Sequence, residues 1–160
     1  MGSIEEKIIT AGFTLPQLTT VAGLYSPAMR TGNLVYTSGQ LPLQNGRLVD
    51  PGGKGKVNDS NMQDAVQASK VAILNALAAI KSVTGTLDSI ERVVKLTLYV
   101  ASERIFCSQH LVANGASSLL HEIFGELGGH ARSAVGVAEL PLDASLELEL
   151  IVQCKFPIIQ

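Results

Sequence analysis

The feature that most constrains the fold is an alanine-rich segment between Ser60 and Gly85. Small and aliphatic side chains recur in it at steps of three and four residues, which is the spacing of one face of an α-helix. They are Ala65, Ala68, Ala72, Ala76, Ala79 and Val83, with Ile73, Leu77 and Ile80 widening the stripe. Ser60 and Gly85 suit the two ends of a helix. Because alanine side chains are small, this helix can lie close against a β-sheet.

Two later segments, residues 90–100 and 145–153, alternate between apolar and polar side chains. The alternating residues are Lys95, Thr97 and Tyr99 with Val94, Leu96, Leu98 and Val100 in the first segment, and Glu147 and Glu149 with Leu146, Leu148 and Leu150 in the second. Side chains on a strand point to opposite faces in turn, so each pattern predicts a strand with one buried face. Glu147 and Glu149 are therefore expected to share the other face.

Weaker patterns predict the remaining elements. We expect an N-terminal helix within residues 1–12, strands at 24–30, 34–39 and 133–138, and a second long helix at 108–124. The order helix, β, β, helix, β, helix, β, β predicts an α+β fold, in which one mixed sheet is covered on one face by two long helices.

The length of 160 residues suits a single domain. Residues 44–59 lack apolar periodicity and are expected to form a surface loop. An apolar fraction of 46% with only 16% charged residues is rich for a small domain, and such surface is often buried between subunits. We therefore expect the second face of the sheet to meet another copy of the chain.

Composition argues against several classes of function. The net charge is −2 and the basic residues are scattered, so neither a nucleic-acid footprint nor a membrane-binding basic face is expected. Cys107 and Cys154 are far apart, and the three histidines fit no zinc spacing, so no metal site is expected. The acidic N-terminus and the lack of a long uninterrupted apolar run predict a cytoplasmic protein, with an organelle lumen as the alternative.

Arg132 and Glu147 are the main candidates for chemistry. A guanidinium is permanently charged and can hold a carboxylate through two parallel hydrogen bonds, although Arg132 could instead form an ion pair with Glu139 or Glu149. Glu147 could lie on a solvated strand face. If that face meets a neighbouring subunit, its shielded carboxylate could instead orient or deprotonate a water molecule.

Four other residues are weaker candidates for binding a ligand. Ser38 and Gly39 could present a hydroxyl group and an open backbone, but they also suit a plain strand end. Tyr25 could cover a small ligand or simply pack at a sheet edge. Asn114 lies in the middle of the second long helix, where an amide normally faces water.

Taken together, residues 24–28, 32–42, 131–141 and 145–149 and Asn114 resemble the YjgF/YER057c/RidA family, in the branch called endoribonuclease L-PSP or chorismate-mutase-like. The resemblance implies a chorismate-mutase-like fold assembled as a homotrimer with clefts between subunits. It also implies an enamine/imine deaminase that hydrolyses 2-imino acids to 2-keto acids and ammonia without a metal or organic cofactor.

The same resemblance implies roles for individual residues. Arg132 would grip the substrate carboxylate and Glu147 would position the attacking water, while the remaining pocket positions match Tyr25, Ser38, Gly39 and Asn114. Ala134 stands where classical deaminases commonly have cysteine. A non-catalytic trimer that binds small carboxylates or acts as a chaperone is the alternative, and a ribonuclease or a chorismate mutase is a weaker one.

Overall fold

The structure is a computed structural model that describes residues 2–18 and 23–156. Three helices and two sheets make up most of it. The helices are α1 (Ile4–Thr10), α2 (Met62–Thr84) and α3 (Gln109–Phe124). The main sheet consists of β1 (Ala28–Thr31), β2 (Leu34–Thr37), β5 (Ile90–Ala101), β6 (Ala131–Val137) and β7 (Leu146–Cys154), and a small hairpin consists of β3 (Leu43–Gln44) and β4 (Arg47–Leu48).

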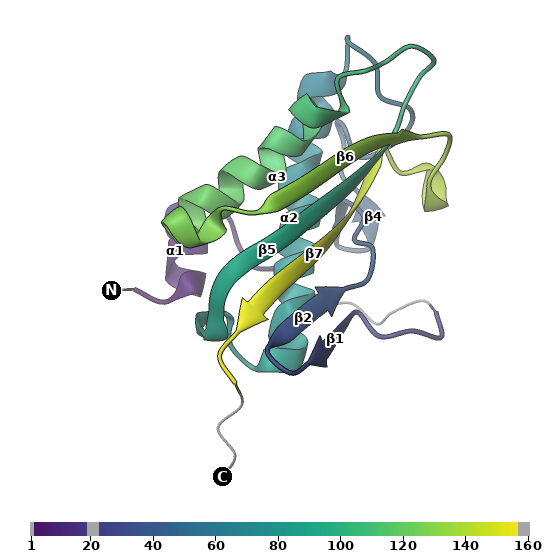
Figure 1. Cartoon of the computed structure of the whole chain (residues 1–160). Helices are drawn as coiled ribbons and strands as arrows, with labels where there is room; N and C mark the ends of the chain where they lie inside the picture. Colours follow the sequence, from purple (N-terminus) through teal and green to yellow (C-terminus); the bar gives the residue numbers. More distant parts are fainter. Residues whose placement is uncertain (1, 19–22, 157–160) are drawn as a thin grey trace.

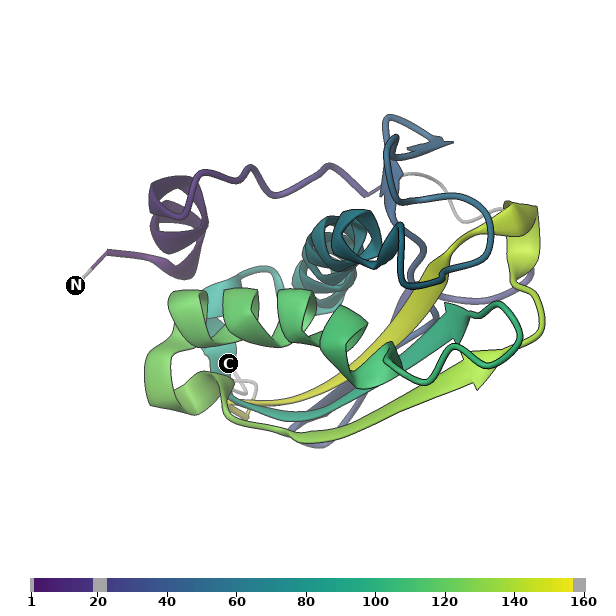
Figure 2. The same cartoon turned by 90° about the horizontal axis from the view of Figure 1, so that it is seen from above.

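The main sheet is mixed and has one covered face. Its strand order is β1-β2-β7-β5-β6, with β5 and β6 parallel and the other neighbours antiparallel. Figure 1 views the strands with the helices behind them, and Figure 2 shows α2 and α3 together on one side of the sheet. This is the predicted α+β architecture, a chorismate-mutase-like fold. We call the face that carries α2 and α3 the helix face and the other one the open face.

The core lies between the sheet and the two long helices. The alanines of the α2 stripe are buried as predicted, whereas Val83 at its end is 38% exposed. By length and composition this helix could cross a membrane, but 56% of its apolar window is buried within the fold. Gly115 of α3 allows the two helices to approach closely. A Cβ there would collide with Val66 O and Ser69 Oγ, which is the packing reason for a glycine in mid-helix.

Strand β5 departs from simple alternation. Its pairing with β7 shifts register between Ile90 and Arg92 and again between Val93 and Lys95. Val93 is therefore buried where the alternating pattern predicts Val94, and regular alternation holds only from Leu96 onward. A β-bulge of this kind inserts one extra residue and turns the side chains on one side of it to the other face.

Segment 44–59 is more ordered than a plain surface loop. It begins with the β3–β4 hairpin and ends on Val57, which is fully buried. The Val57 amide donates to Ala101 O at 2.7 Å, and Val57 O accepts from the Glu103 amide at 2.9 Å. The segment is predicted to be a surface loop, and in the structure main-chain bonds to the end of β5 hold it in place.

Two predicted boundaries also move. Helix α2 begins at Met62 after Asn61 rather than at Ser60, whose hydroxyl donates to Asn58 Oδ1 at 2.7 Å. Strand β1 begins at Ala28 rather than at residue 24, since Pro27 has no N–H to donate to a ladder. Tyr25 consequently lies outside the sheet.

Candidate active site

Arg132 lies at the edge of the sheet beneath α3. It pairs with Leu96, a buried residue of the helix face, so its side chain leaves the sheet on that side. Nη1 donates to Asn114 Oδ1 at 2.9 Å and to Ser117 Oγ at 3.0 Å, and Nη2 donates to His110 O at 3.2 Å. Arg132 does not form the ion pair considered from the sequence. Glu139 lies instead 3.9 Å from Lys56 Nζ, and Glu149 is on the open face.

The guanidinium of Arg132 keeps hydrogen-bonding capacity for a ligand. It has five N–H donors, and three of them are used by the described residues. Two N–H donors of the five therefore remain, which is the number that a carboxylate needs for a contact through both of its oxygens. Since Arg132 is exposed, these donors are accessible in the single chain.

Ser117 and His130 complete the surroundings of Arg132. Ser117 Oγ lies 3.0 Å from His130 Nε2, and His130 Nδ1 lies 2.6 Å from Gly128 O. His130 is half-buried rather than on the surface, and burial lowers its pKa, with the nearby His121 and Arg132 adding to this effect. Ser117 follows Asn114 by three residues on α3, so helical spacing alone could have placed it on the same face. We call Arg132, Asn114, Ser117 and His130 the arginine cluster.

Glu147 lies on the open face of the sheet. It pairs with Tyr99 across β5 and β7, and its side chain is half-buried. Its carboxyl group rests directly over Gly39, where an added Cβ would overlap Oε1. Burial raises the pKa of Glu147, and the nearby Glu149 raises it further. Gly39 is thus required by a close approach rather than by a turn.

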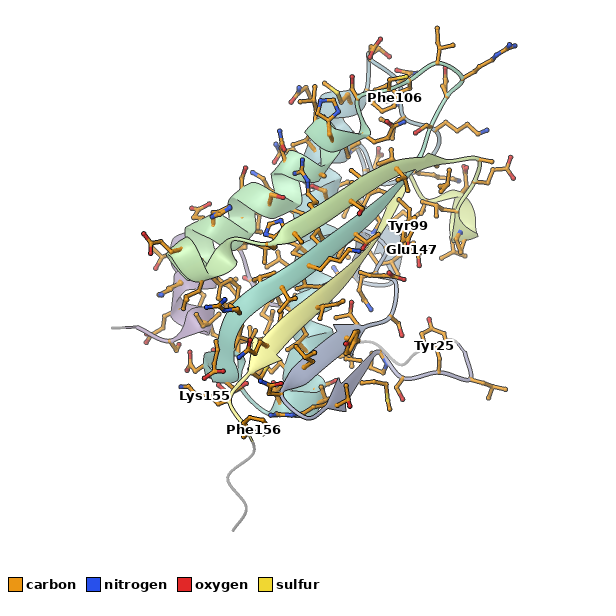
Figure 3. All side chains as sticks on the ribbon, viewed as in Figure 1. Tyr25, Tyr99, Phe106, Glu147, Lys155 and Phe156 are labelled. Carbon is orange, nitrogen blue, oxygen red and sulfur yellow. The ribbon has the colours of Figure 1, made fainter. Side chains whose placement is uncertain are left out.

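Tyr99 and Glu149 lie beside Glu147, and Tyr99 was not singled out from the sequence. The Tyr99 hydroxyl donates to Glu149 Oε2 at 3.4 Å, and the pKa of Tyr99 is raised by burial and then by Glu149. Figure 3 shows Tyr99 and Glu147 close together on the sheet. We call Glu147, Glu149, Tyr99 and Gly39 the glutamate cluster.

Ser38 connects the end of β2 to the segment that carries Tyr25. Its hydroxyl donates to Ser26 O at 2.6 Å and its amide donates to Pro27 O at 2.9 Å. Tyr25 itself is 58% exposed and lies on the loop beyond the β1–β2 hairpin, apart from Glu147 (Figure 3). Within one chain the ring of Tyr25 does not cover the glutamate cluster.

The two clusters lie on opposite faces of the same sheet. Arg132 is in register with Leu96 on the helix face, whereas Glu147 is in register with Tyr99 on the open face. Strand geometry therefore directs the two side chains away from each other within one chain. Arg132 and Glu147 can meet in one site only if they come from different chains.

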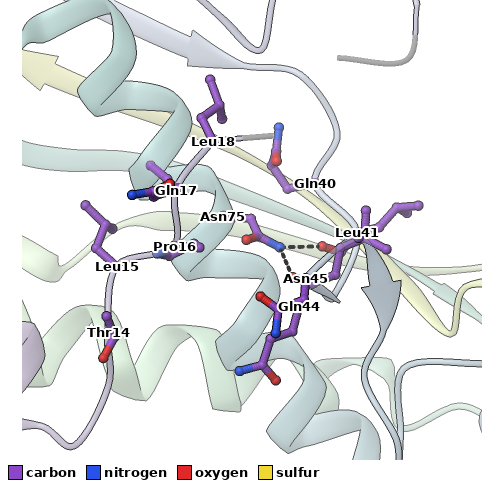
Figure 4. Close-up of a pocket in the computed structure, with 13 residues that line it drawn as sticks. Thr14, Leu15, Pro16, Gln17, Leu18, Gln40, Leu41, Gln44, Asn45 and Asn75 are labelled. Atoms are coloured by element: carbon purple, nitrogen blue, oxygen red, sulfur yellow. Dashed lines mark hydrogen bonds between the residues drawn. The ribbon is translucent and has the colours of Figure 1, made fainter. Parts of the chain in front are cut away.

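A separate cavity lies away from both clusters. It has a volume of about 520 Å³ and is enclosed by residues 14–18, residues 40–46 and the outer side of α2 (Figure 4). Asn75 Nδ2 donates there to Leu41 O and Leu43 O, both at 2.9 Å. The described lining residues include no charged side chain, so this cavity is not suited to anchor a carboxylate. Gln40, which lines this cavity, follows Gly39, and its Nε2 donates to Ser38 O at 3.2 Å.

Residues 2–18 and 23–156 contain no group of three or more His, Cys, Asp or Glu side chains arranged to hold a metal ion. The free cysteines differ in environment, since Cys107 is exposed and Cys154 is buried. The side chains of the two clusters comprise a guanidinium, an amide, an imidazole, carboxyl groups and hydroxyl groups.

The mixed sheet with two helices on one face defines a chorismate-mutase-like α+β protein, and comparison with known proteins specifies the family. Residues 5–153 match the family described as "YjgF/chorismate_mutase-like, putative endoribonuclease". The chain therefore belongs to the YjgF/YER057c/RidA family.

Individual relatives resemble the chain over most of its length. Protein TCP17 of Trypanosoma cruzi is 35% identical and covers 95% of this chain and 94% of its own. The crystal structure of Atu1372 from Agrobacterium tumefaciens, a protein of unknown function, superposes with a TM-score of 0.84 at 42% identity, covering 95% of this chain and 92% of its own. A Dermatophagoides farinae protein named 2-iminobutanoate/2-iminopropanoate deaminase is 30% identical, covering 81% of this chain and 85% of its own.

Proposed function

We propose that the protein is an enamine/imine deaminase that hydrolyses reactive 2-imino acids to 2-keto acids and ammonia. The observation that carries this proposal is the anchored guanidinium of Arg132 with two N–H donors left for a carboxylate. A family relative named as a deaminase of 2-imino acids supports it. Glu147 supplies the second group, because a carboxyl with a raised pKa is a better proton acceptor near neutral pH than an ordinary one.

The site in this proposal is formed between subunits of a homotrimer. The opposite orientation of Arg132 and Glu147 in one chain supports a site shared by two chains. The open face also exposes apolar side chains that a neighbouring subunit would cover, namely Met29, Tyr36 and Val135. The arginine cluster of one subunit then faces the glutamate cluster of the next.

The reaction needs few groups. Arg132 holds the substrate carboxylate, which fixes the adjacent imine carbon in the cleft. Glu147 of the neighbouring subunit accepts a proton from water as the water oxygen bonds to the carbon of the protonated imine, giving a tetrahedral aminoalcohol. Glu147 then passes this proton to the nitrogen. The C–N bond breaks, Glu147 takes the hydroxyl proton as that oxygen forms the ketone, and the proton finally passes to the departing ammonia. The balance is one imino acid and one water consumed, with one keto acid and one ammonia produced.

Arg132→Ala tests the proposal directly. The substitution removes charge-assisted hydrogen bonds to the substrate carboxylate, which contribute about 1.5 to 3 kcal/mol. This free energy corresponds to a reduction of kcat/KM for 2-iminobutyrate and 2-iminopropanoate by roughly 10- to 150-fold. Arg47→Ala, an exposed arginine in the β3–β4 hairpin, is the matched control and should retain wild-type rates. Absence of any accelerated hydrolysis by the wild-type protein would refute the deaminase proposal.

Mixed oligomers test whether the site is shared. Arg132→Ala and Glu147→Gln are each expected to be strongly impaired alone, but a hybrid trimer has one interface that combines an intact Arg132 with an intact Glu147. When equal amounts of the two variants are unfolded and reassembled together, about three quarters of the trimers contain both variants. Each of these hybrid trimers has one intact site of its three. The mixture should therefore regain about a quarter of the wild-type activity. No recovery in verified hybrids would mean that both groups act within one chain.

A non-catalytic carboxylate-binding trimer is the second candidate. The exposure of Tyr25, which leaves the glutamate cluster uncovered in one chain, favours it. In that case 2-ketobutyrate should bind saturably to the wild-type protein, more weakly to Arg132→Ala, and no imine should be hydrolysed. Ribonuclease activity is disfavoured by the net charge of −2 and by the paired carboxyl groups of Glu147 and Glu149, which repel phosphate.

A further inference from the structure

A chain of hydrogen bonds leads from Arg132 into the connection between α3 and β6. Arg132 Nη1 donates to Ser117 Oγ at 3.0 Å, Ser117 Oγ lies 3.0 Å from His130 Nε2, and His130 Nδ1 lies 2.6 Å from Gly128 O. None of the sequence motifs includes Ser117 or assigns a role to His130. This series of hydrogen bonds nevertheless begins at Arg132, the cation of the proposed site.

The direction of each bond follows from the last one. A carbonyl oxygen only accepts, so His130 Nδ1 must carry the proton that it donates to Gly128 O. In the neutral imidazole Nε2 then has a lone pair, and it accepts the hydroxyl proton of Ser117. The oxygen of Ser117 is left to accept from Arg132. Every bond therefore points from Arg132 towards Gly128, and bonds aligned in this way strengthen one another.

The surroundings of His130 favour its neutral form. Arg132 of β6 is linked to His130 through two hydrogen bonds by way of Ser117. The centre of the His121 ring of α3 lies 6.0 Å from that of the His130 ring. Arg92 of β5 and Glu126 of the short helical turn after α3 line a surface pocket together with His130. Burial has the largest effect and lowers the pKa of His130, the hydrogen bond to Gly128 O raises it, and His121 and Arg132 lower it again.

We propose that His130 is a positioning residue, which in its Nδ1-protonated neutral form orients the Ser117 hydroxyl and thereby fixes Nη1 of Arg132, so that the unused N–H groups on Nε and Nη2 are held for the substrate carboxylate. Asn114 holds the same nitrogen from the other side at 2.9 Å. Protonation of His130 reverses the middle bond, since Nε2 then donates to Ser117 and the hydroxyl proton must turn elsewhere. Two cations would then share one oxygen, and the guanidinium would lose its fixed orientation.

The catalytic role of His130 rests on the proposed deaminase function. The assignment of its proton to Nδ1 is independent of that function. Nitrogen-15 NMR of the wild-type protein at pH 7.5 is expected to show the His130 proton on Nδ1. Ser117→Ala should keep that tautomer and shift the Nε2 resonance, because Nε2 loses its donor. A proton on Nε2 in the wild-type protein would overturn the inference whatever the activity.

Four variants separate positioning from a structural role. His130→Ala and Ser117→Ala are each expected to lower kcat about 10-fold, the effect of losing one neutral hydrogen bond. The double variant should be no worse than either single one, because both act on the same chain of bonds. In His130→Gln the amide oxygen can take the place of Nε2 as acceptor, so that kcat should return to within about threefold of wild type.

The pH dependence gives a further readout. The ratio of wild-type to His130→Gln kcat cancels the titration of Glu147 and of the substrate. Because the pKa of His130 is lowered, this ratio should fall only on the acidic side of the usual histidine range, as His130 becomes protonated. A merely structural histidine predicts additive losses, no rescue by glutamine and a flat ratio. If the wild-type protein hydrolyses imines but the variants behave in that way, the inference fails while the function stands. If the wild-type protein is inactive, the function fails and the NMR measurement still decides the tautomer.

Discussion

Gly39 is the residue on which the position of the Glu147 carboxyl group depends most directly. A Cβ added at Gly39 would overlap Glu147 Oε1 and would lie 2.7 Å from Cδ and 3.0 Å from Cγ. Carbon atoms in contact normally stay about 3.5 Å or more apart, so Gly39→Ala should displace the carboxyl group by about 1 Å. The backbone of Gly39 is not in the left-handed region, and alanine therefore adds no conformational strain there.

The expected effect of Gly39→Ala is on rate rather than on binding. A 1 Å misplacement of a reacting group costs on the order of 100-fold, which is about 2.7 kcal/mol of transition-state stabilisation. We expect kcat to fall by roughly that factor, while KM stays near its wild-type value because Arg132 is untouched. The midpoint temperature of thermal unfolding should differ from that of the wild-type protein by no more than about 3 °C.

The assay follows keto acid formation from a 2-imino acid that an amino acid oxidase generates in situ. The double variant Gly39→Ala/Glu147→Asp should be faster than the product of the two single effects predicts, since aspartate is one methylene shorter and leaves room for the new methyl group. Gly46→Ala is the contrasting control. Its φ of 76° and open surroundings predict lower stability with unchanged kcat. A Gly39→Ala protein within threefold of the wild-type kcat would refute the placement of Glu147 as the water-activating group.

Two further predictions concern stability. The pKa of Glu147 is raised above 4.5 in the folded protein, so its contribution to stability is fully present below pH 4.5 and is lost as the pH rises through the folded-state pKa. Glu147→Gln should therefore unfold at a higher temperature than wild type at pH 7.5 and lose this advantage below pH 4.5; an equal difference at both pH values would contradict the burial argument. Gly115→Ala brings a methyl group against Val66 O and should cost about 1 to 3 kcal/mol in chemical denaturation, whereas Ser118→Ala, exposed on the same helix, should be neutral or slightly stabilising.

Local periodicity was sufficient to predict the elements that position the site. The alanine stripe of α2, the start of α3 after Ser108, and the opposite faces of Leu148 and Glu147 all follow from spacing along the chain. These features depend on residues within a few positions of one another. For the same reason the fold class could be predicted from the order of the elements.

Features that depend on contacts between distant segments could not be predicted in this way. The bulge near Val93 is set by pairing with β7, and the burial of Val57 is set by main-chain bonds to Ala101. The close approach of Gly39 to Glu147 joins residues that are far apart in the sequence. Likewise, the contact of Ser117 with His130 exists only because the parallel pairing of β5 and β6 places the start of β6 beneath α3.

The tyrosines of the open face offer a label-free test of the proposed assembly. The chain contains no tryptophan and only three tyrosines, and two of these, Tyr36 and Tyr99, belong to the open face. Intrinsic fluorescence excited near the tyrosine absorption maximum therefore comes largely from the surface that a neighbouring subunit would cover. Dilution of the protein should change this emission as subunits separate, and Tyr99→Phe would reveal how much of the signal arises beside Glu149.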